Sequence, residues 1–201
     1  MPQITPTKGN LISTKRSMTL AQLGFELIDR KRNILIREIT TLIDTAAELQ
    51  SKISSVFSEA YGSLQIANIT LGICEEIAGA VEVDDSINII TRSVMGVELP
   101  QVIASDSPPK LAYGFSESNG ALDDAYIKFH RVKELTHMLA EVETKIYRLA
   151  HAIKRAQKRA NALTNIIIPN FDATIKFISE ALEEKEREEF VRLKVIKNTT
   201  N

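Results

Sequence analysis

The chain contains 201 residues, of which 44% are hydrophobic and 5% aromatic, and its net charge at pH 7 is −1. A charge so close to zero excludes a whole-chain attraction to nucleic acid or to an anionic membrane. The composition is rich in Ala, Ile, Leu, Glu, Lys and Arg and lacks tryptophan. This bias favours long helices over a compact β-sandwich or barrel.

Two features bear on the cellular compartment. The single cysteine, Cys74, cannot form an intrachain disulfide, which fits a reducing compartment. The longest uncharged run, 60–74, is too short and too polar to span a bilayer. We therefore expect a soluble protein that reaches a membrane only through partners, without direct insertion.

The first sixty residues show an apolar stripe with helical spacing. Leu20, Leu23 and Leu27 lie on one phase, and a second phase begins after the basic cluster 30–32. Steps of four and three residues predict a helix that buries one face against another helix. The predicted seam residues of this helix are Leu35, Ile39, Leu42, Leu49, Ile53 and Val56, with Ala46 and Ala60 on the same stripe.

The middle of the chain has a different character. Residues 61–80 predict a short helix, and 86–103 form an apolar, nearly uncharged patch that predicts a β-hairpin. Residues 104–120 are rich in turn-forming residues, and Asn119-Gly120 marks the last turn before a second long helix.

The last third carries the clearest pattern, a heptad seam of about five repeats. A sustained period of 3.5 residues predicts a left-handed supercoil. Pro169 is expected to kink the helix, which continues to about residue 197. The predicted seam residues are Val132, Leu135, Leu139, Val142, Ile146, Leu149, Ile153, Leu163 and Ile167, with Ala156 and Ala160 on the same stripe.

Two such stripes in one chain most simply fold back on each other. The predicted fold is therefore mainly α-helical, a long antiparallel two-helix coiled coil with a small insertion that holds a short helix and a β-hairpin. The expected parts are the N-terminal helix 1–60, the insertion 61–120 at the far end of the coiled coil, and the C-terminal helix 121–197.

Candidate sites for chemistry are weak. His130, Glu134 and His137 share a helix face, but His130, His137 and His151 all fall at the outermost heptad position, so we expect exposed side chains and no metal site. The basic residues between 154 and 159 lack the interleaved aromatic residues of a nucleic-acid site. Nothing indicates an active site or a cofactor, and Cys74 is expected to be a buried structural thiol.

Five motifs occur in a fixed order along nearly the whole chain. Together they resemble the D subunit of the V-type and archaeal-type (A-type) rotary ATPases, although Asn33 and Ala160 depart from the residues usual in that family. The motifs are "TPTKGNL" (5–11), "LIDRKRNIL" (27–35), "SVMGVELP" (93–100), "LAYGFSESNGALDDA" (111–125) and "RANALTNIIIPNFDATIKFISEALEEKEREEFVRLKVIK" (159–197).

This resemblance implies a non-catalytic rotor component of the central stalk, peripheral on the cytoplasmic face of the membrane. Its termini would lie inside the hexamer of catalytic and regulatory A and B subunits. Its middle would bind the F subunit of the stalk, and its far end would face the membrane-side coupling subunit (C/d type). The competing hypothesis is a free-standing coiled-coil scaffold or tethering protein.

The hairpin is expected to lie at the far end, where it would cap the helix ends and offer an edge or an apolar surface to a partner. The residues expected to contact that partner are Ile89, Val94, Met95, Val97 and Leu99.

Overall fold

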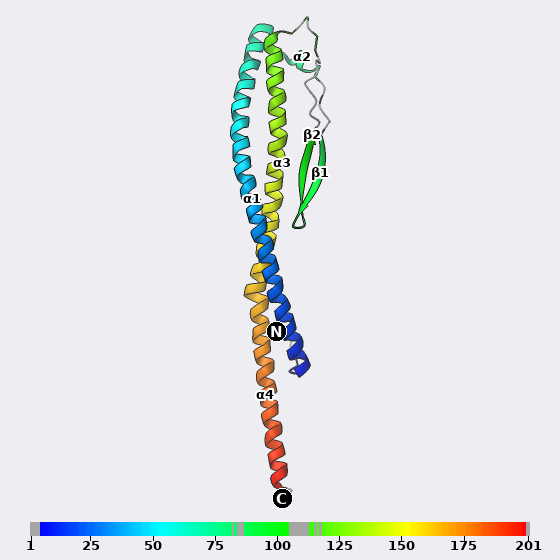
Figure 1. The fold of residues 1–201 in the computed structure, drawn as a ribbon, viewed down its shortest axis with the longest axis vertical. Coiled ribbons are helices and arrows are strands. Elements are labelled where there is room, and N and C mark those ends of the chain that lie inside the picture. The colour runs from blue at the N-terminus through cyan, green and yellow to red at the C-terminus, as the bar shows by residue number, and fades with distance from the viewer. Residues whose placement is uncertain are drawn as a thin grey trace. The chain divides into compact units, whose positions relative to one another are not determined.

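The computed structural model describes residues 5–81, 83, 87–104, 113–114, 116 and 118–199. Most of them are helical, as expected, and two strands form a small antiparallel sheet (Figure 1). In chain order the elements are α1 (Lys8–Leu71), α2 (Glu75–Ala78), β1 (Ile87–Val94), β2 (Val97–Ala104), α3 (Gly120–Ala162), the π-helix η1 (Leu163–Ile167) and α4 (Ile168–Thr199).

The chain divides into two units. One comprises residues 35–152, and the other comprises 1–34 together with 153–201. In the first unit, the later part of α1 packs antiparallel to α3. Residues late in α1 contact the start of α3, since Asn119 donates a hydrogen bond to Thr70 (2.8 Å) and the ring of Tyr61 meets Phe129 edge-on at 5.4 Å. The predicted antiparallel helix pair is confirmed.

The first helix continues past residue 60 to Leu71, and the short helix that we expected over 61–80 occupies only Glu75–Ala78. The buried stripe explains the extension, because Ala60 and Ala67 are both fully buried and tertiary packing outweighs the low helix propensity of a glycine within the run. The helix ends where Gly72 adopts a positive φ of 84°, a conformation that favours glycine.

The second long helix begins where the sequence predicts. Asn119 is its N-cap, because the Asn119 side-chain oxygen accepts a hydrogen bond from the backbone N–H of Leu122 (3.0 Å). This bond satisfies one of the N–H groups that a helix start leaves without an intrahelical partner.

The predicted β-hairpin is confirmed. Val94 pairs with Val97 across the two-residue turn formed by Met95 and Gly96. Their φ angles of 50° and 73° are those of a type I′ turn, which matches the twist of paired strands. Gly96 adopts this conformation without steric cost.

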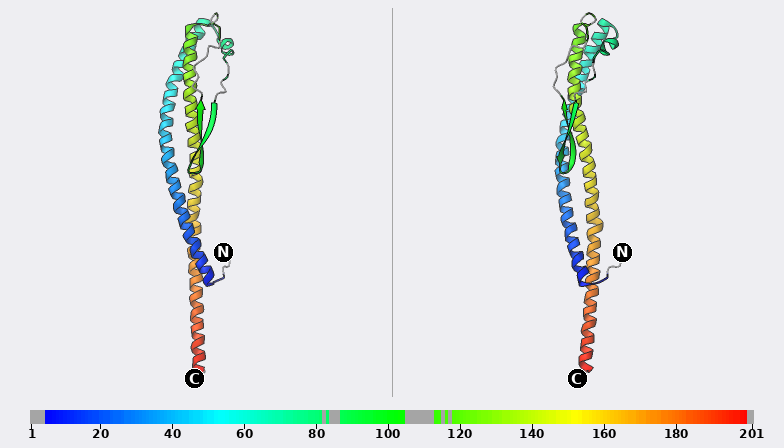
Figure 2. Two further views of the ribbon diagram at one scale, coloured as in Figure 1. Left: turned by 45° about the vertical axis from the view of Figure 1, so that its right-hand side comes forward. Right: turned by 90° about the vertical axis from the view of Figure 1, so that its right-hand side faces the viewer.

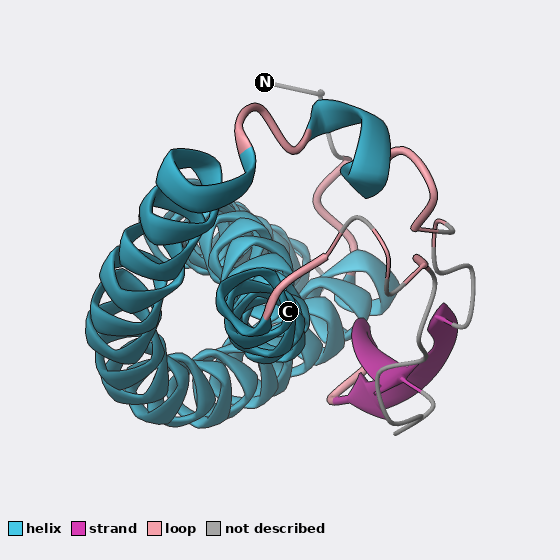
Figure 3. Cartoon of the chain, turned by 90° about the horizontal axis from the view of Figure 1, so that it is seen from above, coloured by secondary structure: helices cyan, strands magenta, loops and turns pink. Residues whose placement is uncertain are grey.

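The hairpin does not cap the helix ends, which corrects the expected location. It lies alongside α3 (Figures 1 and 2), and the view along the helices shows the strands beside them rather than over their ends (Figure 3). Arg148 donates to the backbone oxygen of Glu98 (3.0 Å), and at ~1.5 Å per residue Arg148 is roughly 40 Å from the start of α3 at Gly120. The hairpin takes this position because it buries apolar surface there, since Leu99 of β2 is only 5% exposed.

A separate apolar cluster closes the end of this helix pair. Ala67 of α1, Cys74 and Leu122 of α3 are buried together, and Ile77 of α2 and Tyr113 pack against them. Cys74 is therefore the buried thiol that the sequence predicts.

In the second unit, residues 8–34 of α1 run antiparallel to residues 153–199. Arg32 donates to the side chain of Gln157 (2.7 Å), and Lys8 forms an ion pair with Glu186 (3.0 Å). Ile178 of α4 is fully buried. Both contacts bring an early residue of α1 beside a late residue of the chain, as antiparallel packing requires.

A single π-helical turn, η1, interrupts the apolar stripe of the second unit. Ile167 is 37% exposed, whereas Ile168 is half-buried. The stripe therefore steps by five residues from Leu163 to Ile168, because a π-turn adds one residue to a helix. Pro169 follows immediately and lacks the N–H that a regular α-helical turn would use. The chain continues directly into α4, as the sequence predicts.

We expect the buried seam to carry the stability of the helix pair. Leu149 is fully buried, whereas Met138 of the same helix is 53% exposed. Leu149→Ala should lower the free energy of unfolding by about 2–5 kcal/mol, and Met138→Ala should change it by less than about 0.5 kcal/mol. Urea unfolding of the full chain, followed by circular dichroism, compares the two. Equal effects would contradict the assigned seam.

Candidate partner-binding surfaces

The predicted seam residues lie on the packed side of the helices, except for Ile167. Leu35, Ile53, Val132, Val142 and Leu149 are buried, and Ile39, Leu42, Leu49, Val56, Leu135, Leu139, Ile146, Ile153 and Leu163 are half-buried.

The hairpin residues that we expected to contact a partner fall into two groups. Ile89 is 66% exposed and Met95 is 49% exposed, whereas Leu99 is buried at 5%. Val94 and Val97 are half-buried. Ile89 and Met95 are thus accessible to a partner in this structure, and Leu99 is not.

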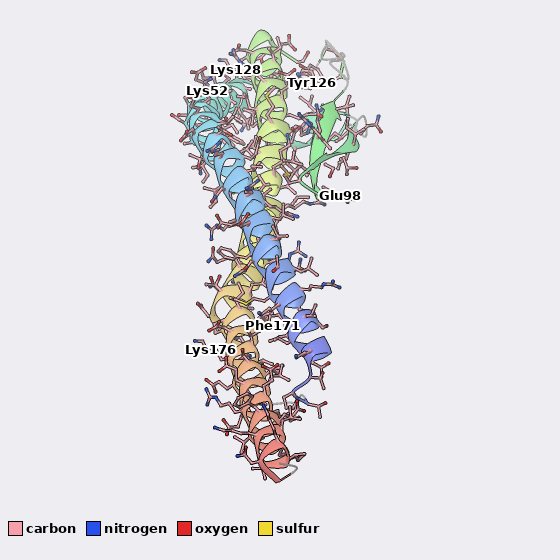
Figure 4. The ribbon with its side chains drawn as sticks, turned by 60° about the horizontal axis from the view of Figure 1, so that its bottom comes forward. Lys52, Glu98, Tyr126, Lys128, Phe171 and Lys176 are labelled. Carbon is pink, nitrogen blue, oxygen red and sulfur yellow. The ribbon has the colours of Figure 1, made fainter. Side chains whose placement is uncertain are left out.

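Two residues of α3 that the sequence did not single out hold the hairpin in place. The Glu141 carboxylate accepts a hydrogen bond from the backbone N–H of Val102 (2.7 Å) and forms an ion pair with Lys145. Arg148 reaches the carbonyl of Glu98, a residue seen close to α3 in Figure 4. Glu141 and Lys145 have the spacing of an ordinary helix-surface pair, so no sequence signal indicates that the backbone of a strand also binds there.

The histidines do not gather around a common point. Only His151 is exposed as expected, and the centroid of its ring lies 4.6 Å from that of the tilted Tyr147 ring. His130 is half-buried with Nδ1 3.5 Å from Glu134, and His137 is half-buried as well. His137 precedes Glu141 by one helical turn, so it lies on the side of α3 that the hairpin contacts. The described residues contain no cluster of ligands that could hold a metal ion.

The charged runs lie on the surface. Lys154, Arg155, Lys158 and Arg159 are exposed. Near the end of α4, Arg187 pairs with Glu183 at 3.8 Å, with more than half of each side chain exposed. The charged residues of α4 form a solvated, charge-paired face rather than an acid–base pair in a pocket.

A polar group joins the two helices of the first unit. Ser63 of α1 donates to Asp124 of α3 (3.0 Å), and Lys128 donates to both Ser63 (2.6 Å) and Asp124 (2.7 Å). Lys128 appears near the start of α3 in Figure 4. The hydrogen bond from Lys128, and then that from Ser63, lowers the pKa of Asp124 below its ordinary value. The spacing of Asp124 and Lys128 is that of an ordinary ion pair on a helix, but the sequence does not indicate that Ser63 of α1 joins them.

Tyr113 lies beside the start of α3. Its hydroxyl donates to Asp123 (2.7 Å), and its ring meets that of Tyr126 edge-on at 5.9 Å. Burial, followed by the hydrogen bond to the Asp123 carboxylate, raises the pKa of Tyr113 to about 12, because both favour the neutral phenol.

The second unit exposes apolar side chains near both ends of the chain. Leu20 and Leu27 of α1 are 68% and 66% exposed. Near the end of α4 a denser group is exposed. Clustered exposed apolar residues of this kind mark surfaces that bind other molecules. The α4 group consists of Phe190, Val191, Leu193, Val195 and Ile196.

Within the described residues, every helix is too short, too polar or too highly charged to form a membrane-crossing segment.

The fold is thus that of a protein built on an antiparallel pair of long helices with a β-hairpin at the side of α3. Residues 10–198 match the family model described as the D subunit of ATP synthase. The D subunit of a V-type ATP synthase from Thermotoga neapolitana is 45% identical over 196 residues, which cover 96% of this chain and 97% of that protein. The D subunit of an A-type ATP synthase from Thermococcus kodakarensis is 39% identical, over 96% of this chain and 93% of that protein.

The corresponding A-type protein from Pyrococcus horikoshii is 38% identical over 97% of this chain and 94% of its own length. These matches span nearly the whole chain in each case. The chain therefore belongs to the ATP synthase D-subunit family of the V-type and A-type rotary ATPases.

The environment of Tyr113 predicts an alkaline dependence of stability. Since the pKa of Tyr113 is raised from 10.0 to about 12 in the fold, its contribution is fully present below pH 10 and is lost as the pH rises towards 12. Tyr113→Phe should remove the tyrosinate absorbance step that titrates near pH 12. The free energy of unfolding should then decrease less between pH 10 and pH 12 than it does in the unmodified chain. Tyr61→Phe, which leaves the Tyr113 hydroxyl and its hydrogen bond to Asp123 in place, is the matched control.

Proposed function

We propose that this chain is the central rotor shaft of its ATPase, a non-catalytic subunit that transmits torque between the ATP-hydrolysing or ATP-synthesising hexamer and the ion-translocating membrane ring. The observation that carries the proposal is the helix pair itself. α1 is a single uninterrupted helix of 64 residues. It packs against helices from the other half of the chain.

Physical reasoning supports this role. A shaft must resist twisting, and two helices that pack through buried side chains resist it better than one helix alone. Within 35–152 the packing combines buried apolar residues, such as Leu35 and Leu149, with the cross-helix group of Ser63, Asp124 and Lys128. Rotation of one helix about the other would have to break both kinds of contact.

The proposed partners follow from the family and from the exposed surfaces. The terminal regions, before about Leu23 and after about Leu182, would lie within the hexamer of A and B subunits. The exposed apolar residues between 190 and 196 suit such an enclosed position. The middle of the helix pair would bind the F subunit of the stalk, and the end of the pair near α2 would face the membrane-side coupling subunit. The complex would place the chain on the cytoplasmic face of the membrane.

The competing hypothesis of a free-standing scaffold is tested by purification. A tagged chain expressed in its own cells should copurify with nucleotide-binding subunits in fixed proportion. Recovery of the chain alone from gently solubilised membranes would contradict the rotary role.

We expect the last turns of α4 to be needed for coupling. Deletion of 190–201 removes the exposed apolar group, so it should weaken the coupling of ATP hydrolysis to ion transport while leaving the binding of the F subunit intact. Deletion of 198–201 removes no apolar residue and is the matched control. Coupling is measured in reconstituted complexes. Loss of the F subunit with normal coupling would reverse the proposed orientation.

We also expect the hairpin to contribute to coupling. Replacement of 87–104 by a Gly-Ser linker should leave most helical content of the full chain unchanged, because the seam lies in α1 and α3. Ion transport per ATP should fall, because a flexible segment cannot hold a partner in register during rotation. Paired measurements of hydrolysis and transport in reconstituted complexes test this. Unchanged transport per ATP would show that the hairpin only covers the side of α3.

A further inference from the structure

The two edges of the β-hairpin differ in how their backbone groups are satisfied. On the β2 edge, the N–H of Val102 donates to Glu141 and the carbonyl of Glu98 accepts from Arg148. Between them lies Pro100, which has no backbone N–H to leave unpaired. The β2 edge is thus occupied by α3.

These contacts also determine which way the backbone groups of β1 point. In an antiparallel pair, residues whose N–H and C=O point outward face each other in the pairs without hydrogen bonds. The strand register pairs Glu98 with Ser93, Pro100 with Thr91, and Val102 with Ile89. The N–H and C=O groups of Ser93, Thr91 and Ile89 therefore point away from β2, along the opposite edge.

The turn leads to the same assignment independently. The two residues that flank a two-residue turn exchange hydrogen bonds across it, and here these are Val94 and Val97. Alternation along the strand then makes Ser93, Thr91 and Ile89 the outward-facing residues. No hydrogen bond from these outward groups occurs within the described part of the chain.

The side chains along this edge offer little protection against another strand. Proteins commonly block an exposed edge with several charges, with proline or with a bulge, but the only charged residue of β1 is Arg92. Ile89 is 66% exposed and Ile90 is 47% exposed. Arg92 lies opposite Leu99, whereas Glu98 lies opposite Ser93 on the other face of the hairpin.

We propose that the free edge of β1 binds an extended strand from another component of the ATPase complex. An extended strand presents N–H and C=O groups at the same two-residue spacing as Ile89, Thr91 and Ser93, at ~3.3 Å per residue. The bound strand carries apolar side chains beside Ile89 and Ile90 and an acidic residue beside Arg92. The β1 edge of a second copy of this chain complements this edge less well, because it would bring a second Arg92, and not an acidic residue, to the pair of strands. The assignment of the bound strand to another component of the ATPase complex rests on the proposed function.

Amide hydrogen exchange at single-residue resolution tests the bound strand directly. In the purified chain, the amides of Ile89 and Thr91 should exchange quickly, while the inward amides of Ile90 and Arg92 are protected. In the purified ATPase complex, exchange at Ile89 and Thr91 should slow by at least about tenfold, the effect of one further hydrogen bond on each amide. Rapid exchange at both amides in the intact complex would overturn the proposal.

Proline substitution provides a second test. Thr91→Pro removes an outward N–H but no hydrogen bond of the hairpin, so the fold should persist, as judged by protection of Ile90 and Arg92. It should reduce retention of the chain in the complex by roughly five- to tenfold relative to Thr91→Val, which keeps the N–H. Equal retention of the two variants would overturn the proposal.

Two further outcomes are distinguishable. Protection of Ile89 and Thr91 that rises with the concentration of the purified chain would mean pairing between copies, and would overturn the assignment to another component of the complex. Copurification with nucleotide-binding subunits tests the proposed function separately. A complex that forms normally with both amides unprotected would remove the strand site and leave the rotor role intact.

Discussion

The burial of one aliphatic stripe against another is the interaction on which the rest of this structure depends. Helices in proteins derive most of their stability from the packing of an apolar face rather than from intrinsic propensity. Small residues within the stripe, such as Ala60 and Ala160, are almost completely buried. Small side chains at a helix contact let the backbones approach closely, which shortens the distance between the helix axes.

The remaining elements pack against this helix pair, either at one end or along its side. The Ala67, Cys74 and Leu122 cluster closes one end of the pair within 35–152. The hairpin uses the outer side of α3, where Glu141 and Arg148 bind its backbone. The stripe packs the helices against each other, and the hairpin binds to the outer side of α3 through its backbone.

The π-turn at Leu163–Ile167 shows how a local irregularity is accommodated without ending a helix. Pro169 cannot complete a regular α-helical turn, and the extra residue shifts the apolar stripe from Ile167 to Ile168. Packing then resumes, with Ile178 fully buried. π-turns are often found at functional positions, and this one separates α3 from the helix that carries the exposed apolar residues 190–196.

The sequence by itself determined the two long helices, their apolar faces, the start of α3 at Asn119-Gly120 and the presence of the hairpin, because each depends on periodicity or on a local turn. Only the tertiary structure decided that α1 continues to Leu71, that the stripe shifts at η1, and that the hairpin lies beside α3 with its β2 edge covered. These features depend on contacts between residues distant in sequence, such as Val102 with Glu141. A single sequence carries no local signal for such contacts.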